Sequence, residues 1–174
     1  ECWGHLLNLI LKDIHDELKL RLPDVFLVQQ HYGKSSVFQS YMQSHDAVRC
    51  TIPSYVETRF YSLSKLFHTI NQLFDLINQF AQEELGKEEL IPEGYRVFIE
   101  IADSFLATFK SVIEKFESEK FGCISYVLPG IQMLKFAAEQ FRETYPELFA
   151  AFDGSCIKHI DPILMNPDKY NELL

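Results

Sequence analysis

The sequence predicts an all-α protein, an antiparallel bundle of about five to seven helices. Apolar residues recur at spacings of three and four along most of the chain, which is the period of helices that face a core. No window alternates convincingly between apolar and polar residues as a half-buried strand does. Short polar joints separate the periodic segments, so we expect consecutive helices to run antiparallel.

Length and composition indicate one domain over residues 1–174. The chain has 174 residues, 47% of them hydrophobic and 15 of them phenylalanine, which is enough for one sizeable core. It begins on Glu1 rather than methionine, and we expect it to be part of a longer protein.

The clearest helix is predicted over residues 55–83. It follows Pro53, and Ser54 with Glu57 has the spacing of a capping box at a helix start. An uninterrupted stripe predicts which residues it buries: Leu63, Leu66, Phe67, Ile70, Leu73, Phe74 and Ile77.

Similar stripes predict further helices over residues 3–18, 95–116 and 124–145. Pro129 lies inside the last of these and is expected to kink or break it, because proline cannot donate a backbone hydrogen bond. Gly33 interrupts another predicted helix between residues 24 and 44. After Phe152, turn-forming residues predict only short helices and loops.

Charge and cysteine usage exclude some classes of function. The net charge of −9 opposes non-specific binding to nucleic acid, whose phosphates attract a basic face. Four cysteines without a CxxC spacing indicate free thiols in an intracellular, reducing compartment. No apolar run reaches the roughly 18 residues of a membrane span, so no membrane association is expected.

Three segments carry a family resemblance when they are taken in order. They are Cys2-Trp3-Gly4-His5 with Leu6 to Ile10, Thr58-Arg59-Phe60-Tyr61-Ser62, and Ser118 followed by Cys123 to Pro129. They resemble the C-x-x-H-x-L-N-L, T-R-W-x-S and S-x-x-x-x-P-T-I-x-x-V-L-P segments of the hAT superfamily of DNA transposases. The resemblance implies the helical insertion domain of an RNase H-like transposase, or a host protein derived from one, located in the nucleus.

Arg59 and Phe60 are the candidate DNA-binding residues that this resemblance implies. An arginine there would contact phosphate, and the family's tryptophan would stack on an unpaired base. Phe60 stands in place of that tryptophan and keeps an aromatic face, but it lacks the indole donor. The alternative is an Arg59 paired with an acidic side chain beside a buried Phe60.

Cys2, His5 and Asn8 form a candidate structural motif. Cys2 and His5 would share one helix face and could supply half of a zinc site. Two further ligands are needed, and His15, His31 and Cys50 show no ligand spacing among themselves. We therefore favour a buried thiol and a hydrogen-bonded histidine that pack in the core, and we predict no metal and no cofactor.

No catalytic residues are predicted, and the chain alone is not expected to be an enzyme. The resemblance implies a nuclease with three carboxylates on two divalent metals, but it places the first two aspartates upstream of Cys2. Asp161-Pro162 is similar to the family's L-D-P segment and is predicted to be a capping turn.

The resemblance therefore implies a module that positions DNA ends or associates with other subunits of its own kind in a longer protein. A protein-interaction bundle without a nucleic-acid role is the first alternative. A small-molecule pocket lined by phenylalanines is the second.

Overall fold

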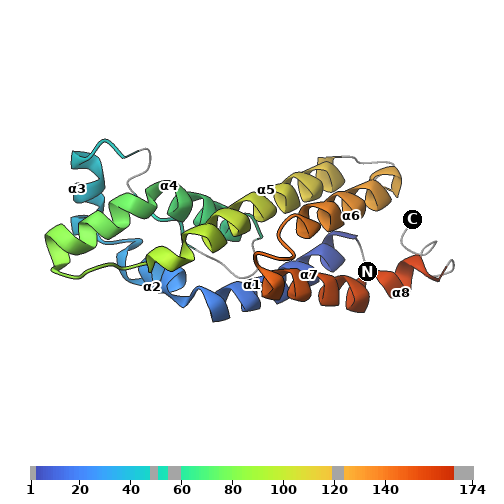
Figure 1. Ribbon diagram of the computed structural model, residues 1–174. Helices are drawn as coiled ribbons and strands as arrows, with labels where there is room; N and C mark the ends of the chain where they lie inside the picture. The colour runs from blue at the N-terminus through green and yellow to red at the C-terminus, as the bar shows by residue number, and fades with distance from the viewer. Residues whose placement is uncertain (1–2, 48–50, 55–59, 119–123, 167–174) are drawn as a thin grey trace. The chain divides into compact units, whose positions relative to one another are not determined.

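The computed structural model describes residues 3–47, 51–54, 60–118 and 124–166. The regular secondary structure assigned in these ranges is all helical, which confirms the all-α class. Seven α-helices within the described ranges have nine or more residues, and α8 is a single turn (Figure 1). Contacts divide the chain into two compact units, Lys19–Ser104 and a unit formed by Glu1–Leu18 with Phe105–Leu174. The single domain over 1–174 stays a prediction.

The unit Lys19–Ser104 is built on α4 (Phe60–Leu85), the longest helix. All seven residues predicted to be buried on it are at most 3% exposed, so this part of the prediction is confirmed. Glu57 of the predicted capping box lies outside the described residues. The 3₁₀ turn η1 (Glu93–Tyr95) leads into α5 (Arg96–Ser118).

Two helices pack on α4 where one interrupted helix was predicted. They are α2 (Pro23–Tyr32) and α3 (Ser36–Ser44), and the Ser35 hydroxyl caps α3 by accepting a 3.3 Å hydrogen bond from the Phe38 amide. A Cβ on Gly33 would lie 2.5 Å from the Gln29 carbonyl oxygen, so only glycine fits the end of α2 without a shift. Edge-on rings of Phe38 and Phe80, 5.2 Å apart, join α3 to α4.

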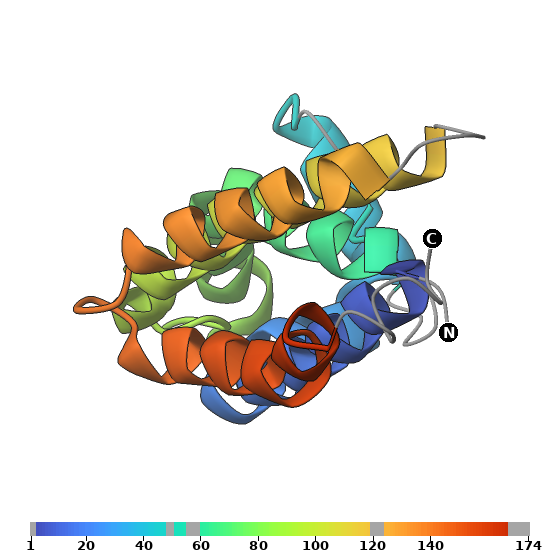
Figure 2. The same cartoon turned by 90° about the vertical axis from the view of Figure 1, so that its right-hand side faces the viewer.

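The other unit combines the first part of α1 (Trp3–Arg21), most of α5, α6 (Ile124–Glu139), α7 (Pro146–His159) and α8 (Asp161–Leu164). The Phe105 ring lies edge-on to Phe141 at 5.0 Å and to Phe152 at 5.2 Å. Figure 2 shows α6 and α7 joined by a turn. Phe141 and Tyr145 belong to this turn, and both are buried. The predicted stripe up to Tyr145 is therefore a helix that ends at Glu139, followed by a turn whose two aromatic side chains are buried.

Two predicted interruptions are not observed in this unit: a break of the helix at Pro129, and a change to only short helices and loops after Phe152. α6 continues through Pro129 without a break. The proline removes one backbone hydrogen bond, but Val127 and Ile131 on either side of it stay buried. α7 continues through Gly154, with Phe152 and Cys156 buried. Burial of these side chains outweighs the roughly 1 kcal/mol by which glycine disfavours a helix relative to alanine.

Candidate functional site

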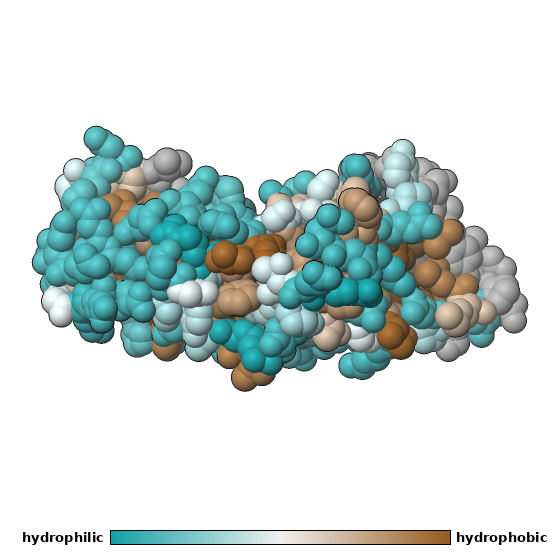
Figure 3. Space-filling model, in the orientation of Figure 1, coloured by the Kyte–Doolittle hydropathy of each residue, from teal (hydrophilic) through white to brown (hydrophobic). Residues whose placement is uncertain are grey.

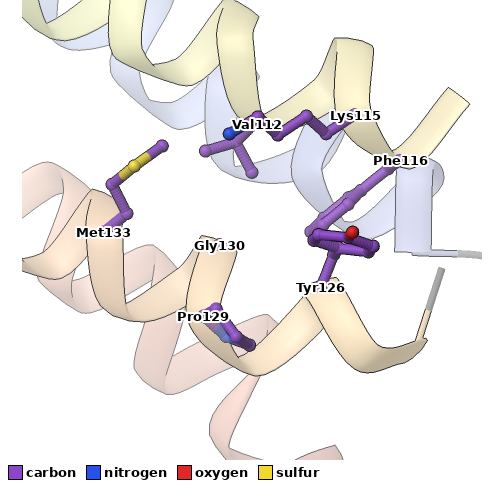
Figure 4. A pocket seen from close by; sticks show the side chains of 7 residues that line it. All are labelled: Val112, Lys115, Phe116, Tyr126, Pro129, Gly130 and Met133. Carbon is purple, nitrogen blue, oxygen red and sulfur yellow. The ribbon is translucent and has the colours of Figure 1, made fainter. Parts of the chain in front are cut away.

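A small apolar groove between α5 and α6 is the candidate site (Figure 4). Its cavity has a volume of about 70 Å³, well below the 300–1,000 Å³ of typical small-molecule sites. It therefore suits the end of one side chain better than a whole metabolite. The groove is lined by Val112, Lys115, Phe116, Tyr126, Pro129, Gly130 and Met133.

Gly130 explains how the two helices form this groove. A Cβ at Gly130 would lie 2.9 Å from Phe116 Cζ and 3.0 Å from Val112 Cγ1. The missing side chain thus lets α6 approach the side chains of α5 closely. Pro129 beside it is exposed and adds an apolar ring to the rim.

An exposed apolar row on α6 continues the groove. Tyr126 is 44% exposed, Met133 38% and Phe136 69%, and their spacing places them on one side of the helix with Pro129. The opposite side is buried through Val127, Ile131, Leu134 and Ala138. In Figure 3, apolar patches interrupt a largely hydrophilic surface. A contiguous exposed apolar patch commonly marks a binding surface.

The α6 surface also carries no unbalanced charge. Lys135 and Glu139 are the two charged residues of the helix. The Lys135 ammonium lies 3.4 Å from an Asp161 carboxylate oxygen, and the Arg142 guanidinium lies 2.8 Å from a Glu139 carboxylate oxygen. On a chain with a net charge of −9, this is a locally neutral surface.

A second constellation brings Asp13, Ser155 and His159 together. The buried Ser155 hydroxyl donates a 2.7 Å hydrogen bond to Asp13 Oδ2, and His159 Nε2 lies 3.6 Å from the same oxygen. In a hydrolase triad the serine hydroxyl donates its hydrogen bond to the histidine, whereas the Ser155 hydroxyl donates to the Asp13 carboxylate. Because Ser155 is only 2% exposed, a substrate could not reach its hydroxyl. The arrangement fits a structural role, in which polar contacts of Asp13 link α1 to α7.

The residues singled out in the sequence fall in different places. Cys2 and Arg59 lie outside the described residues, and Phe60 is the first residue of α4, with its side chain not described. His5 and Asn8 are both exposed on α1, so the core position expected for His5 is not observed. The core contacts of this segment come instead from Leu6 and Leu7.

The other predicted ligand and motif positions are also dispersed. His15 is buried and lies 3.0 Å from a carboxylate oxygen of its neighbour Asp16, whereas His31 is exposed. Asp161 is the first residue of α8 and pairs with Lys135 rather than capping the helix. Within the described ranges, no three histidine, cysteine or carboxylate side chains cluster as metal ligands.

No helix in the described part of the chain has both the length and the apolar content of a membrane span. No protein-family model, curated protein or solved structure matches this chain. The resemblance to hAT transposases stays a prediction from the motifs.

Sequence reasoning missed the groove, although a signal for it was present. Tyr126, Met133 and Phe136 are apolar residues outside the buried stripe of α6. A helix that is apolar on two sides has a second surface to cover. The Asp13–Ser155 pair had no local signal, because 142 residues separate the two.

Proposed function

We propose that this chain is a non-catalytic protein-interaction module that binds apolar side chains of a partner protein in the groove between α5 and α6. The exposed row of Tyr126, Met133 and Phe136 beside the groove supports this proposal most directly. Burying such side chains against a partner contributes about 25 cal/mol for each Å² removed from water. Exposed aromatic residues and methionine are also enriched where proteins meet.

The chemistry of the groove favours a protein partner over nucleic acid. Lys115 is the one cationic residue among the seven that line it. Phosphate recognition needs several lysines or arginines on one surface, and the net charge of −9 opposes it further. An amphipathic helix with apolar residues at spacings of three and four is the partner element that fits a groove of this kind.

Peptide selection tests this proposal directly. Helical peptides would be selected from a random library against the folded chain, and binding mapped by NMR on ¹⁵N-labelled protein. We expect apolar residues at helical spacing in the peptides, shifts centred on α5 and α6, and affinity at least about tenfold lower for Phe136→Asp.

Leu20→Asp is the matched control for this experiment. Leu20 is 71% exposed on α1, so the same charge is introduced at a similarly exposed apolar position outside the groove. Its affinity for the peptides should equal that of the wild type. Failure to select any peptide, or equal binding by Phe136→Asp, would contradict the proposal.

A role in positioning DNA ends is the second candidate function. It is favoured by the order of the three motifs and by the place of Phe60 at the first described residue of α4. A stacked Phe60 would contribute about 1–3 kcal/mol to binding a hairpin-ended DNA. Equal affinity of wild type and a folded Phe60→Ala variant at low salt would remove this candidate.

The proposal of a non-catalytic module also means that the chain alone does not cleave DNA. Supercoiled plasmid with magnesium or manganese is the assay, and we expect no nicking above buffer. Nicking that copurifies with the chain and disappears after a point substitution in it would show an enzyme instead.

A further inference from the structure

We propose that residues 87–92 form a strap on α4 that opens while the helices stay folded, and that the Asn78 side chain holds this strap closed. The strap joins α4 to η1, and both it and α4 belong to the compact unit Lys19–Ser104. This inference is independent of the groove between α5 and α6 and of the function proposed for it.

Asn78 binds the middle of the strap through main-chain atoms. Its Oδ1 accepts hydrogen bonds of 3.0 Å from the backbone amides of Leu90 and Ile91, and its Nδ2 donates one of 2.8 Å to the Ile91 carbonyl oxygen. Gln82, one helical turn further along α4, donates a 3.0 Å hydrogen bond to the Glu88 carbonyl oxygen. Three of these four hydrogen bonds therefore depend on one side chain.

Both ends of the strap are fixed by other contacts. Gly86 follows α4 with a φ of 62°, a left-handed conformation that glycine adopts without a steric cost. The Lys87 amide then donates a 2.9 Å hydrogen bond back to the Ala81 carbonyl oxygen, which closes the end of the helix. Beyond η1, the Arg96 guanidinium pairs with Asp75 of α4. The strap can therefore open between two ends that stay in place.

Little apolar burial opposes this opening. Of residues 87–92, all of which the structure describes, Ile91 alone is buried, at 0% exposed, and Lys87, Glu88 and Glu89 are exposed. Segments with few buried apolar side chains open locally at a lower free-energy cost than the core.

Charge also favours the open strap. Residues 83–89 contain four glutamates and one lysine, and they lie at the C-terminal end of α4, which is the negative end of its helix dipole. Like charges repel, so the closed strap depends on the hydrogen bonds from Asn78 and Gln82 and on the burial of Ile91. Opening would expose the Ile91 side chain to solvent.

Hydrogen exchange followed by NMR tests local opening in the wild type. The amides of Leu90 and Ile91 should exchange at least about tenfold faster than the amide of Ile77 in the buried stripe of α4. Their exchange should also respond less to low urea concentrations, because local opening exposes less surface than unfolding. Equal rates with equal urea dependence would mean that the strap opens only when the protein unfolds, and would overturn the inference.

Thiol labelling tests the role of Asn78 without using the amides that it binds. Ile91→Cys would be placed in a background with Cys2, Cys50 and Cys123 replaced by serine, and mass spectrometry would locate the label. Adding Asn78→Ala should speed labelling at position 91 at least about tenfold, because the closed strap loses three hydrogen bonds. Circular dichroism checks that each variant is folded.

Ser155→Ala is the matched control for this labelling. It also removes a buried hydrogen bond, but one between α7 and α1 that stays formed when only the strap opens. Labelling at position 91 should therefore keep its rate in Ser155→Ala, even though the free energy of unfolding falls. Equal acceleration by Asn78→Ala and Ser155→Ala would show labelling through global unfolding and would overturn the inference, as would an unchanged rate in Asn78→Ala.

Discussion

Gly130 and Phe116 approach so closely that a Cβ on the glycine would lie 2.9 Å from Phe116 Cζ. Real Cβ atoms essentially never lie this close to another atom, so an alanine here must push the Phe116 ring aside. Gly154 in α7 provides the opposite case, because an added Cβ would meet nothing within 4 Å. The two helical glycines therefore have different structural roles.

Gly130→Ala and Gly154→Ala should change stability in opposite directions. Alanine gains about 1 kcal/mol over glycine in a helix interior, while overpacking costs about 1–3 kcal/mol. We expect Gly130→Ala to lower the free energy of unfolding by about 1 kcal/mol and Gly154→Ala to raise it by about 0.5–1 kcal/mol. Urea unfolding measures both. Equal stabilisation of the two variants would show that α5 yields freely at Gly130.

Phe74→Ala should destabilise the protein strongly. Phe74 is 2% exposed, and the guanidinium of Arg96 lies 4.2 Å from its ring centre. Loss of a buried phenylalanine costs about 3–5 kcal/mol through lost burial and the cavity left behind. Urea unfolding monitored by circular dichroism measures the change, and Gln72→Ala on the exposed side of α4 is the control. A cost below about 1 kcal/mol would contradict the packing described here.

Tyr41 should make stability depend on pH at both ends of the scale. Its hydroxyl donates a 2.6 Å hydrogen bond to Glu83 Oε2. Burial, together with this bond, raises the pKa of Tyr41 to about 12, and the bond lowers the pKa of Glu83. Stability from the protonated phenol is complete below the ordinary pKa of 10.0 and is lost as pH rises toward 12. Stability from the ionised Glu83 is complete above its ordinary pKa of 4.5 and is lost as pH falls below that value.

Tyr41→Phe should therefore flatten both limbs of the stability profile. Urea unfolding at pH 3.5, 7, 10.5 and 11.5 measures it. Tyr126→Phe is the matched control, because it removes a hydroxyl from a tyrosine that is 44% exposed. If the wild-type and Tyr41→Phe profiles run parallel from pH 10 to 12, the hydrogen bond to Glu83 does not form in solution.

Ser155→Ala should lower stability by about 1–2 kcal/mol, because a buried hydroxyl loses its hydrogen bond to a carboxylate. Asp13→Ala should cost a similar amount, since it leaves the Ser155 hydroxyl without this acceptor. A double-mutant cycle in urea measures the coupling between the two. Ser40→Ala on the exposed side of α3 should change stability by less than about 0.5 kcal/mol. Additive effects of Ser155→Ala and Asp13→Ala would contradict the tie between α1 and α7.

The sequence determined the helical class and the buried stripe of α4 because both depend on a local period. Leu63, Ile70 and Ile77 recur at helical spacing, and such spacing places apolar side chains on one face wherever the helix packs. Gly33 also marked the interruption between α2 and α3, although its close approach to the Gln29 carbonyl and the cap at Ser35 came from the structure.

The tertiary structure decided where helices continue and which apolar side of α6 is left exposed. Pro129 and Gly154 disfavour a helix locally, but burial of neighbouring side chains outweighs a cost of a few kcal/mol that the sequence alone cannot set against it. Phe136 is exposed for a similar reason, since α6 is apolar on two sides and the packing buries the side of Val127 and Ile131. Contacts such as Ser155 with Asp13 join residues far apart in the chain, so only the packed helices bring them together.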